Sequence, residues 1–491
     1  MTDTLSSPCG QNEALLEALR QAVGAAAVLR ADANDALDRH QIDWRKRYRG
    51  LALAVVFPAS TQEVTKVVGL CARHRVSIVP QGGNTSLVGG SVPDDSGQQI
   101  VLNLSRLNRV LSVDAVNLSM TVQAGCLLAD VQRAADEAGL LFPLSLASEG
   151  SCTIGGNLAT NAGGTQVLRY GTARELCLGL EAVTADGEVW DGLKSLRKDN
   201  TGYDLRDLLI GSEGTLAIIT AATLRLFPRP THRQAALIGC HTLAQCVSLL
   251  QQARLQLDAR LTGFEVMHQP PIQLALRHLP EQAHAARALL SPSQPDLPNW
   301  TVLMDTADTG RHSTLHTDLE TLLDEAQQQG LIERAVLSHT DTQYRAMWSL
   351  REAIPLAEKT EGHMVKHDIA VPTSQVPAFV DQAADALQAL VPGCRVICFG
   401  HLGDGNLHYN VQAPTCISTE AFLAQHESAI HTVIYDLALQ LGGTLSAEHG
   451  IGQLKRDELR LRQSVTSTAW MRAIKHALDP DHRLNPGRLV P

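Results

Sequence analysis

The sequence is short of positive charge and contains no long apolar segment. Lys and Arg total 41 against 51 Asp and Glu, which gives a formal net charge of -10. Without an excess of cations to neutralise a phosphate backbone, we expect no nucleic-acid partner. No run reaches the roughly 18 apolar residues of a membrane span, and the N-terminus lacks a basic stretch followed by an apolar one. We therefore predict a cytoplasmic protein without a transmembrane segment.

Paired cysteines are also lacking. The ten cysteines are scattered, with no CxxC pair and no spacing of the iron–sulfur kind. This pattern excludes an iron–sulfur cluster and fits a reducing compartment. The 491 residues are 44% hydrophobic, which is enough apolar material for two or three domains.

The chain divides by pattern into four parts. Residues 12–30 carry apolar residues at helical spacing, and from residue 51 short β-rich runs alternate with glycine turns and helical stretches such as 127–138. Pro228 and Pro230 indicate a linker before longer helical segments, and the final part returns to glycine-rich turns. We predict a helical segment at 1–45, a first α/β region at 46–228, a second domain at 229–440 and a C-terminal segment at 441–491.

Glycine and small polar residues are concentrated in four segments before the linker. The segments are 80–90 (PQGGNTSLVGG), 151–164 (SCTIGGNLATNAGG), 169–187 and 200–220. Glycine lets backbone N–H groups approach a pyrophosphate closely, so four such segments together favour a dinucleotide site over ordinary tight turns. The sequence contains neither G-x-G-x-x-G nor the Walker motif, so the nucleotide site must have another architecture.

Two further segments predict a metal site in the second half of the chain. They are FGHLGDGNLHYN at 399–410 and SAEHGIGQLK at 446–455. Two histidines that flank a glycine turn, together with one carboxylate, form a His2Glu set suited to Zn²⁺ or a similar divalent ion. We predict His401, His408 and Glu448 as the ligands.

The glycine segments resemble the FAD-binding domain shared by vanillyl-alcohol oxidase and p-cresol methylhydroxylase. The resemblance covers roughly residues 40–228 and implies an α+β fold. This fold has a two-subdomain FAD-binding domain of the p-cresol methylhydroxylase type, followed by a substrate (cap) domain with an antiparallel sheet and helices. A C-terminal segment then returns to the flavin. The first loop has no histidine or cysteine, which implies FAD without a covalent bond. Ser86 and Ala217 stand where many members have glycine. By the same resemblance the cofactor-binding residues are Pro80, Gly82, Gly83, Asn84, Thr85, Ser86, Ser148, Thr153, Gly156, Asn157, Thr160, Asn161, Gly163, Gly164, Ile218 and Asn485.

Residues 344–372 resemble the substrate segment of the FAD-linked D-2-hydroxyacid dehydrogenases, in particular the D-2-hydroxyglutarate dehydrogenases. The resemblance implies that Arg351 and Lys366 hold the substrate and that Asn410 contacts it. Pro355 stands where the hydroxyglutarate enzymes have a threonine, so substrate length stays open. A divalent ion can acidify the substrate hydroxyl, His449 can take its proton, and a flavin can accept a hydride. We predict His449 as the catalytic residue.

The leading hypothesis is thus an FAD-dependent dehydrogenase for D-2-hydroxyglutarate, D-lactate or glycolate. Electrons would pass to a separate acceptor such as electron-transfer flavoprotein, a quinone or a cytochrome, and a homodimer is possible. One alternative is an oxidase that uses dioxygen. The other is a non-catalytic FAD-binding subunit of a multi-subunit glycolate-oxidising complex, although such a subunit has no reason to keep all five polar residues His401, His408, Glu448, His449 and Arg351.

Overall fold

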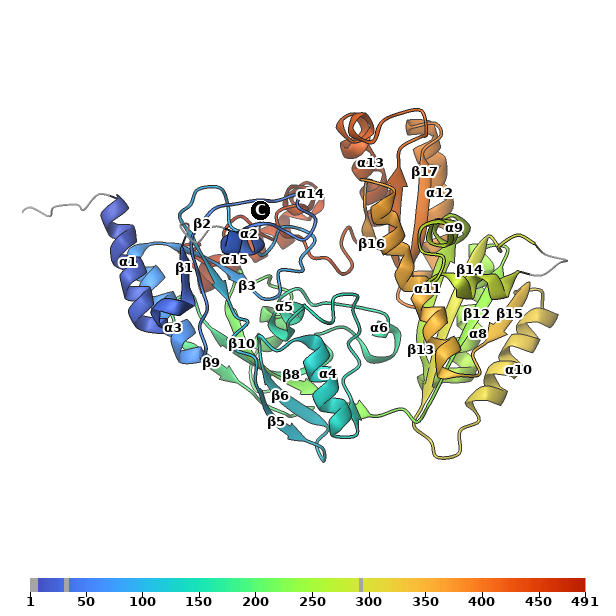
Figure 1. Ribbon diagram of the computed structural model, residues 1–491, viewed down its shortest axis with the longest axis horizontal. Coiled ribbons are helices and arrows are strands. Elements are labelled where there is room, and N and C mark those ends of the chain that lie inside the picture. Colours follow the sequence, from blue (N-terminus) through green and yellow to red (C-terminus); the bar gives the residue numbers. More distant parts are fainter. Residues whose placement is uncertain (1–7, 31–34, 291–294, 491) are drawn as a thin grey trace, which may run out of the picture. The chain divides into compact units, whose positions relative to one another are not determined.

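The computed structural model describes residues 8–30, 35–290 and 295–490, which form two compact units (Figure 1). Unit 1 comprises residues 1–162, 172–228 and 448–491, and unit 2 comprises residues 163–171 and 229–447. The chain passes from unit 1 to unit 2 after Pro228, beside the prolines that indicated a linker. It returns at Glu448, so the C-terminal part of unit 1 begins later than residue 441.

Unit 1 is built on two sheets. In the four-stranded sheet, β2 and β3 both pair in parallel with β4, whereas β1 pairs antiparallel with β2. The five-stranded sheet is antiparallel throughout and has the order β5-β6-β10-β8-β9. The strands of the first sheet are β1 (Val28–Arg30), β2 (Ala52–Val56), β3 (Ser77–Gln81) and β4 (Gln99–Asn103). Those of the second are β5 (Val110–Asp114), β6 (Ser119–Gln123), β8 (Cys177–Val183), β9 (Val189–Gly192) and β10 (Ile218–Arg225), and β7 (Leu140–Leu141) pairs separately with β11 (Phe227–Pro228).

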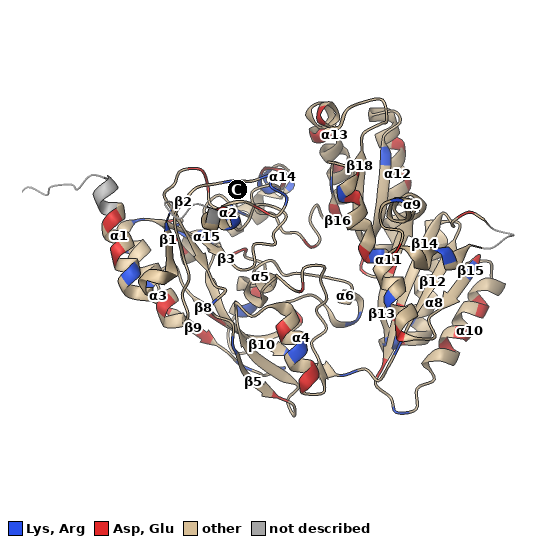
Figure 2. Ribbon diagram, in the orientation of Figure 1, with Lys and Arg blue, Asp and Glu red and all other residues tan. Residues whose placement is uncertain are grey.

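Several helices of unit 1 begin with a side-chain cap. In α3, the Ser60 side chain accepts the Glu63 N–H at the N-terminus, and Arg75 ends the helix in the left-handed conformation. Figure 2 shows acidic and basic residues interspersed on α4, where Arg133 lies near Asp130 and Glu137. The helices are α1 (Pro8–Val23), α2 (Asp35–Gln41), α3 (Thr61–His74), α4 (Leu128–Glu137), α5 (Ile154–Ala159), α7 (Leu205–Leu209), α14 (Arg456–Arg462) and α15 (Val465–Leu478).

The C-terminal part of unit 1 differs from the sequence-based expectation of glycine-rich turns. Helices α14 and α15 occupy the middle of it, and glycine turns flank them. Ser464 caps α15 by accepting the Ser467 N–H, and the helix contains no glycine or proline. The expectation gave too much weight to the glycines on either side of the helices.

Unit 2 is built on one seven-stranded antiparallel sheet with the order β15-β12-β14-β13-β17-β18-β16. Leu237 and Leu303 pack in a core with α9 and α11, and their strand neighbours on the opposite face are also buried. Both faces of the central strands are therefore covered. The strands are β12 (His232–Cys240), β13 (Leu261–His268), β14 (Trp300–Asp308), β15 (Arg334–Leu337), β16 (Asp368–Ala370), β17 (Arg395–His401) and β18 (Asn406–Gln412).

Long helices cover this sheet. Thr242 and Gln245 form a capping box at the start of α8, and the Thr340 side chain caps α11. The helices of unit 2 are α6 (Val167–Tyr170), α8 (Leu243–Leu257), α9 (Gln269–His278), α10 (Leu315–Gln328), α11 (Asp341–Thr360), α12 (Val376–Leu390) and α13 (Thr419–Gln440). Among the described residues, no helix is both long enough and apolar enough to span a bilayer.

Candidate active site

The first two glycine segments lie against each other in unit 1. Gly82 and Gly83 follow β3, and Ser151 and Thr153 precede α5. A Cβ placed on Gly82 would overlap the Thr153 hydroxyl, and one on Gly83 would overlap the Ser151 carbonyl oxygen. Glycine is therefore needed at these positions for steric reasons, because the backbone of the first loop packs directly against the backbone and the Thr153 side chain of the second.

Three asparagines in these loops use their side chains to hold the loops themselves. Asn84, at φ +53°, donates to the carbonyl oxygens of Arg39 and Ile42 at 2.9 Å each. Asn161, at φ +49°, accepts the Thr172 hydroxyl at 2.8 Å, and Asn157 is buried beside the Cys152 sulfur. These amides shape the loops, which leaves backbone groups as the natural contacts for a bound cofactor.

Asn485 supplies the clearest sign of a ligand site in unit 1. Its Nδ2 donates to the carbonyl oxygens of Gly90 at 2.9 Å and Glu213 at 2.7 Å. Its Oδ1 is buried and, within the described residues, has no hydrogen-bond partner. A buried acceptor without a partner costs free energy, so this atom fits a donor on a bound group. The residues of unit 1 thus fit FAD.

The other predicted cofactor residues belong to the same segments. Pro80 is in β3 and Ile218 begins β10, whereas Gly163 and Gly164 begin the short stretch of chain assigned to unit 2. The Thr160 hydroxyl donates to Gly156 within the α5 segment, and the Ser148 carbonyl accepts the N–H groups of Ser151 and Cys152. The remaining two, Thr85 and Ser86, lie in the first loop.

Two of the predicted metal ligands, His401 and His408, lie on the hairpin of β17 and β18. Strands β17 and β18 pair so that His401 faces Asn406 and His408 faces Phe399. The potential ligand atoms of His401, His408 and Glu448 all lie within 4.8 Å of one another. Glu448 directly follows Ala447, whose N–H donates to the Asp368 carbonyl oxygen at 3.2 Å. Nitrogen and oxygen donors this close together suit one divalent ion.

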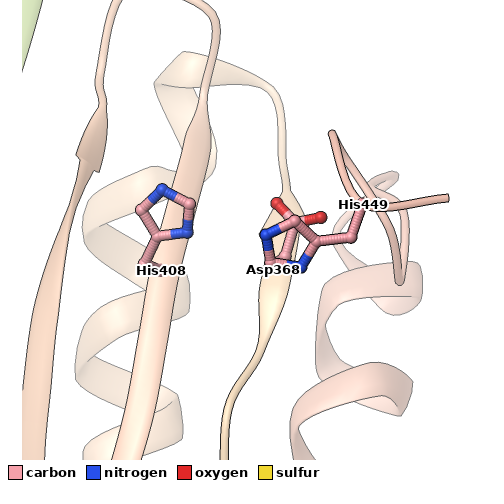
Figure 3. Close-up of side chains that lie close together, drawn as sticks. All are labelled: Asp368, His408 and His449. Atoms are coloured by element: carbon pink, nitrogen blue, oxygen red, sulfur yellow. The ribbon is translucent and has the colours of Figure 1, made fainter. Parts of the chain in front are cut away.

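A second group shares His408 and includes a residue that the sequence analysis missed. Potential ligand atoms of Asp368, His408 and His449 also lie within 4.8 Å of one another (Figure 3). Asp368 on β16 pairs across the sheet with His408, and its buried carboxylate accepts the Asn406 amide at 3.0 Å. In the sequence, Asp368 could have been singled out as a site candidate because it stands two residues after Lys366, at the start of a short apolar strand.

Glu265 is the second residue that sequence reasoning missed. It lies on β13, its side chain is 0% exposed, and its cross-strand partner is His401. Its Oε1 is 2.5 Å from His401 Nδ1, and its Oε2 accepts the Arg351 Nε–H at 2.7 Å. Burial raises the pKa of Glu265, but the neighbouring His401 and Arg351 charges oppose this more strongly and leave the pKa below its ordinary value.

Arg351 projects from α11, and the two terminal nitrogens of its guanidinium are available to bind a ligand. Its guanidinium lies over the Phe399 ring, 4.7 Å from the ring centroid, and only Nε bonds to Glu265. In the described part of the chain, neither terminal nitrogen has a hydrogen bond to the protein. These two nitrogens form the planar fork that matches a carboxylate.

Glu358, the third missed residue, joins the other two predicted substrate contacts. Its buried carboxylate accepts Lys366 Nζ at 2.8 Å and Asn410 Nδ2 at 2.6 Å. It lies two turns after Arg351 on the same side of α11. Four of the predicted substrate and metal residues of unit 2 thus contact two buried carboxylates, Arg351 and His401 through Glu265 and Lys366 and Asn410 through Glu358.

The fold and these sites define an FAD-linked oxidoreductase. Residues 52–192 match the FAD binding domain family, and residues 229–489 match the family of FAD linked oxidases, C-terminal domain. Among solved structures, p-cresol methylhydroxylase with substrate bound has a TM-score of 0.72 at 17% identity, covering 98% of this chain and 96% of that one. Alkyldihydroxyacetonephosphate synthase has a TM-score of 0.73 at 18% identity, covering 99% and 86%.

Comparison with curated relatives shows which FAD-linked oxidoreductases this chain is similar to. The D-2-hydroxyglutarate dehydrogenase of Xanthomonas citri pv. viticola is 39% identical over 476 residues, 96% of each chain. The mitochondrial D-2-hydroxyglutarate dehydrogenase of Arabidopsis thaliana is 37% identical over 456 residues, 93% of this chain and 78% of that one. The chain belongs to the family of FAD-linked oxidoreductases that includes the D-2-hydroxyglutarate dehydrogenases. The predicted fold class, FAD dependence and enzyme class are confirmed.

Proposed function

We propose that this enzyme oxidises a D-2-hydroxy acid, D-2-hydroxyglutarate or a close analogue such as D-lactate or glycolate, to the 2-oxo acid. The observation that carries the proposal is the arrangement around Glu265, which places the free fork of Arg351 in one hydrogen-bonded group with the metal-ligand candidate His401. A carboxylate clamp beside a cation site matches a substrate that carries a carboxylate next to a hydroxyl.

In this proposal His401, His408 and Glu448 hold one divalent ion, Zn²⁺ or a similar metal. A bound divalent ion acidifies a hydroxyl, and a bound flavin accepts a hydride. Arg351 holds the substrate carboxylate through its two terminal nitrogens, and Asn410 and Lys366 contact the rest of the substrate. Lys366 would favour a second carboxylate, whereas Pro355 removes a hydroxyl contact, so a panel of acids of different length will define the substrate.

His449 takes the hydroxyl proton on a ring nitrogen. The carboxylate of Asp368 has a ligand-type oxygen within 4.8 Å of the corresponding nitrogen of His449. A carboxylate this close can accept a hydrogen bond from the imidazole and so orient the ring. A competing assignment, with Asp368, His408 and His449 as the metal ligands, leaves this proton without an acceptor among the three.

FAD is held without a covalent bond in this proposal, because residues 80–90 contain no histidine or cysteine. Acid precipitation should release all the flavin to the supernatant.

Electrons leave to a separate acceptor, an electron-transfer flavoprotein, quinone or cytochrome, since no iron–sulfur spacing occurs in the sequence. We further propose a cytoplasmic location. Peroxide formed in step with turnover in air would identify an oxidase instead.

The function is tested by mixing the purified enzyme anaerobically with D- and L-2-hydroxy acids and following the flavin absorbance. Rapid bleaching by one or more D-acids, with slow or no bleaching by the L-forms, is expected. Flavin that stays oxidised with every acid of the panel would indicate a non-catalytic FAD-binding subunit.

A further inference from the structure

We infer that Glu265 is a positioning residue that fixes the proposed metal ligand His401 and the proposed carboxylate clamp Arg351 relative to each other. This inference rests on the proposed function and adds a residue to it. Glu265 lies on β13, opposite His401 on β17, and its side chain is fully buried among the strands and α11. Both contacts lie within unit 2.

The first contact sets the tautomer of His401. Glu265 Oε1 is 2.5 Å from His401 Nδ1. An ionised carboxylate offers only acceptors, so Nδ1 carries the proton and the neutral ring keeps its lone pair on Nε2. A carboxylate behind a metal-binding histidine fixes the ring orientation and raises its basicity. Glu265 therefore leaves Nε2 as the His401 nitrogen that would bind a divalent ion.

The second contact sets the direction of Arg351. Glu265 Oε2 accepts the Nε–H of the guanidinium at 2.7 Å, while the Phe399 ring lies under its face. The guanidinium is planar, so fixing Nε and one face also fixes the terminal fork. One carboxylate thus orients the metal ligand and the clamp together.

Charge, and not only polarity, is required at this position. His401 Nδ1–H and Arg351 Nε–H are both donors, and a carboxylate of this length can accept both. Glutamine has the same shape but one acceptor and one donor, so it can satisfy His401 or Arg351 but not both. A buried ion pair contributes little to stability by itself, which makes orientation the better explanation for this arrangement.

Glu358 provides a matched control. It is also a buried carboxylate in unit 2 that accepts two donors, Lys366 Nζ and Asn410 Nδ2. Both donors belong to the proposed substrate site, and neither is a proposed metal ligand. Glu358→Gln therefore creates the same chemical mismatch without touching His401.

The experiment compares the FAD-loaded parent, Glu265→Gln and Glu358→Gln. Zinc affinity is measured by competition with a chromophoric chelator. KM for D-2-hydroxyglutarate is measured in a steady-state assay with an artificial electron acceptor. We expect Glu265→Gln to weaken zinc binding roughly 10- to 100-fold and to raise KM. Glu358→Gln should raise KM while its zinc affinity equals that of the parent. Parent-like zinc affinity in Glu265→Gln, an equal loss in both variants, or a parent that binds no zinc would overturn the inference.

Failure of the proposed function would be visible in the parent alone, as flavin that no hydroxy acid reduces, and the zinc comparison would still stand. If Glu265→Gln does not fold, the parent itself provides the test. Histidine nitrogen NMR of the zinc-loaded parent, with His401 assigned through His401→Gln, should show the His401 proton on Nδ1. A proton on Nε2 would overturn the inference.

Discussion

Glu213 accepts the backbone N–H of Ile451 at 2.7 Å, and its second carboxylate oxygen accepts the N–H of Gly452 at the same distance. Glu213 belongs to the fourth glycine segment, and Ile451 follows the EHG sequence of Glu448 and His449. A buried side chain from the cofactor region of unit 1 therefore fixes the loop that follows the proposed base.

Replacing Glu213 by glutamine should loosen this loop. Glutamine has one acceptor oxygen for two N–H groups, and an unpaired buried N–H costs about 1–3 kcal/mol. Urea unfolding should show a loss of stability of that size, together with slower flavin reduction. Glu188→Gln, at an exposed position of the same unit, serves as the control. Equal unfolding free energies for the two variants would show that the contacts are not needed.

A methyl group at Gly83 should interfere with FAD binding. The added Cβ would overlap the Ser151 carbonyl oxygen and push the two cofactor loops apart, at a cost of about 1–3 kcal/mol. The ratio of flavin to protein absorbance should fall in Gly83→Ala. In Gly69→Ala, within α3, the Cβ meets nothing within 4 Å, so this variant should keep all its flavin. Full flavin content in Gly83→Ala would contradict the account.

Arg351→Lys tests the carboxylate clamp. Lysine keeps the charge but loses the planar fork, so reduction of the flavin by substrate should fall ~10²-fold or more. Flavin content should not change, because Arg351 lies in unit 2 and is not among the predicted cofactor residues. Arg345→Lys, at an exposed position of the same helix, is the matched control. Equal reduction rates in the two variants would assign the carboxylate to another residue.

The parts of the site that the sequence predicted are those determined by local patterns. Gly82 and Gly83 sit in a short glycine-rich loop, and His401 and His408 flank a glycine turn, so residue type and spacing were enough to single them out. The resemblance to known FAD enzymes added Arg351, Lys366 and their roles.

The missed residues depend on contacts between distant segments. Glu265 lies 136 positions before His401, and only the pairing of β13 with β17 brings them together. Glu358 contacts Asn410 from 52 positions away. In the sequence, Glu265 is a single acidic residue within an apolar strand. Its sequence neighbours do not reveal the hydrogen-bond donors that stabilise the buried carboxylate.

His449 is expected to act beside the metal and not as a ligand. His449→Ala should retain the metal, while flavin reduction falls roughly 10²- to 10⁴-fold, the usual contribution of a positioned general base. Elemental analysis of the variant, together with its reduction rate, checks both parts. Loss of the metal along with activity would favour the group formed by Asp368, His408 and His449 as the ligand set.

The most direct test of the account is the dependence of flavin reduction on the metal. The purified enzyme is analysed for metal and then mixed anaerobically with D-2-hydroxyglutarate, or with the D-acid that bleaches it fastest, before and after treatment with a strong chelator. We expect about one divalent ion per chain, and we expect the chelator to abolish bleaching while FAD stays bound. Full bleaching by a preparation that contains no metal would contradict the account.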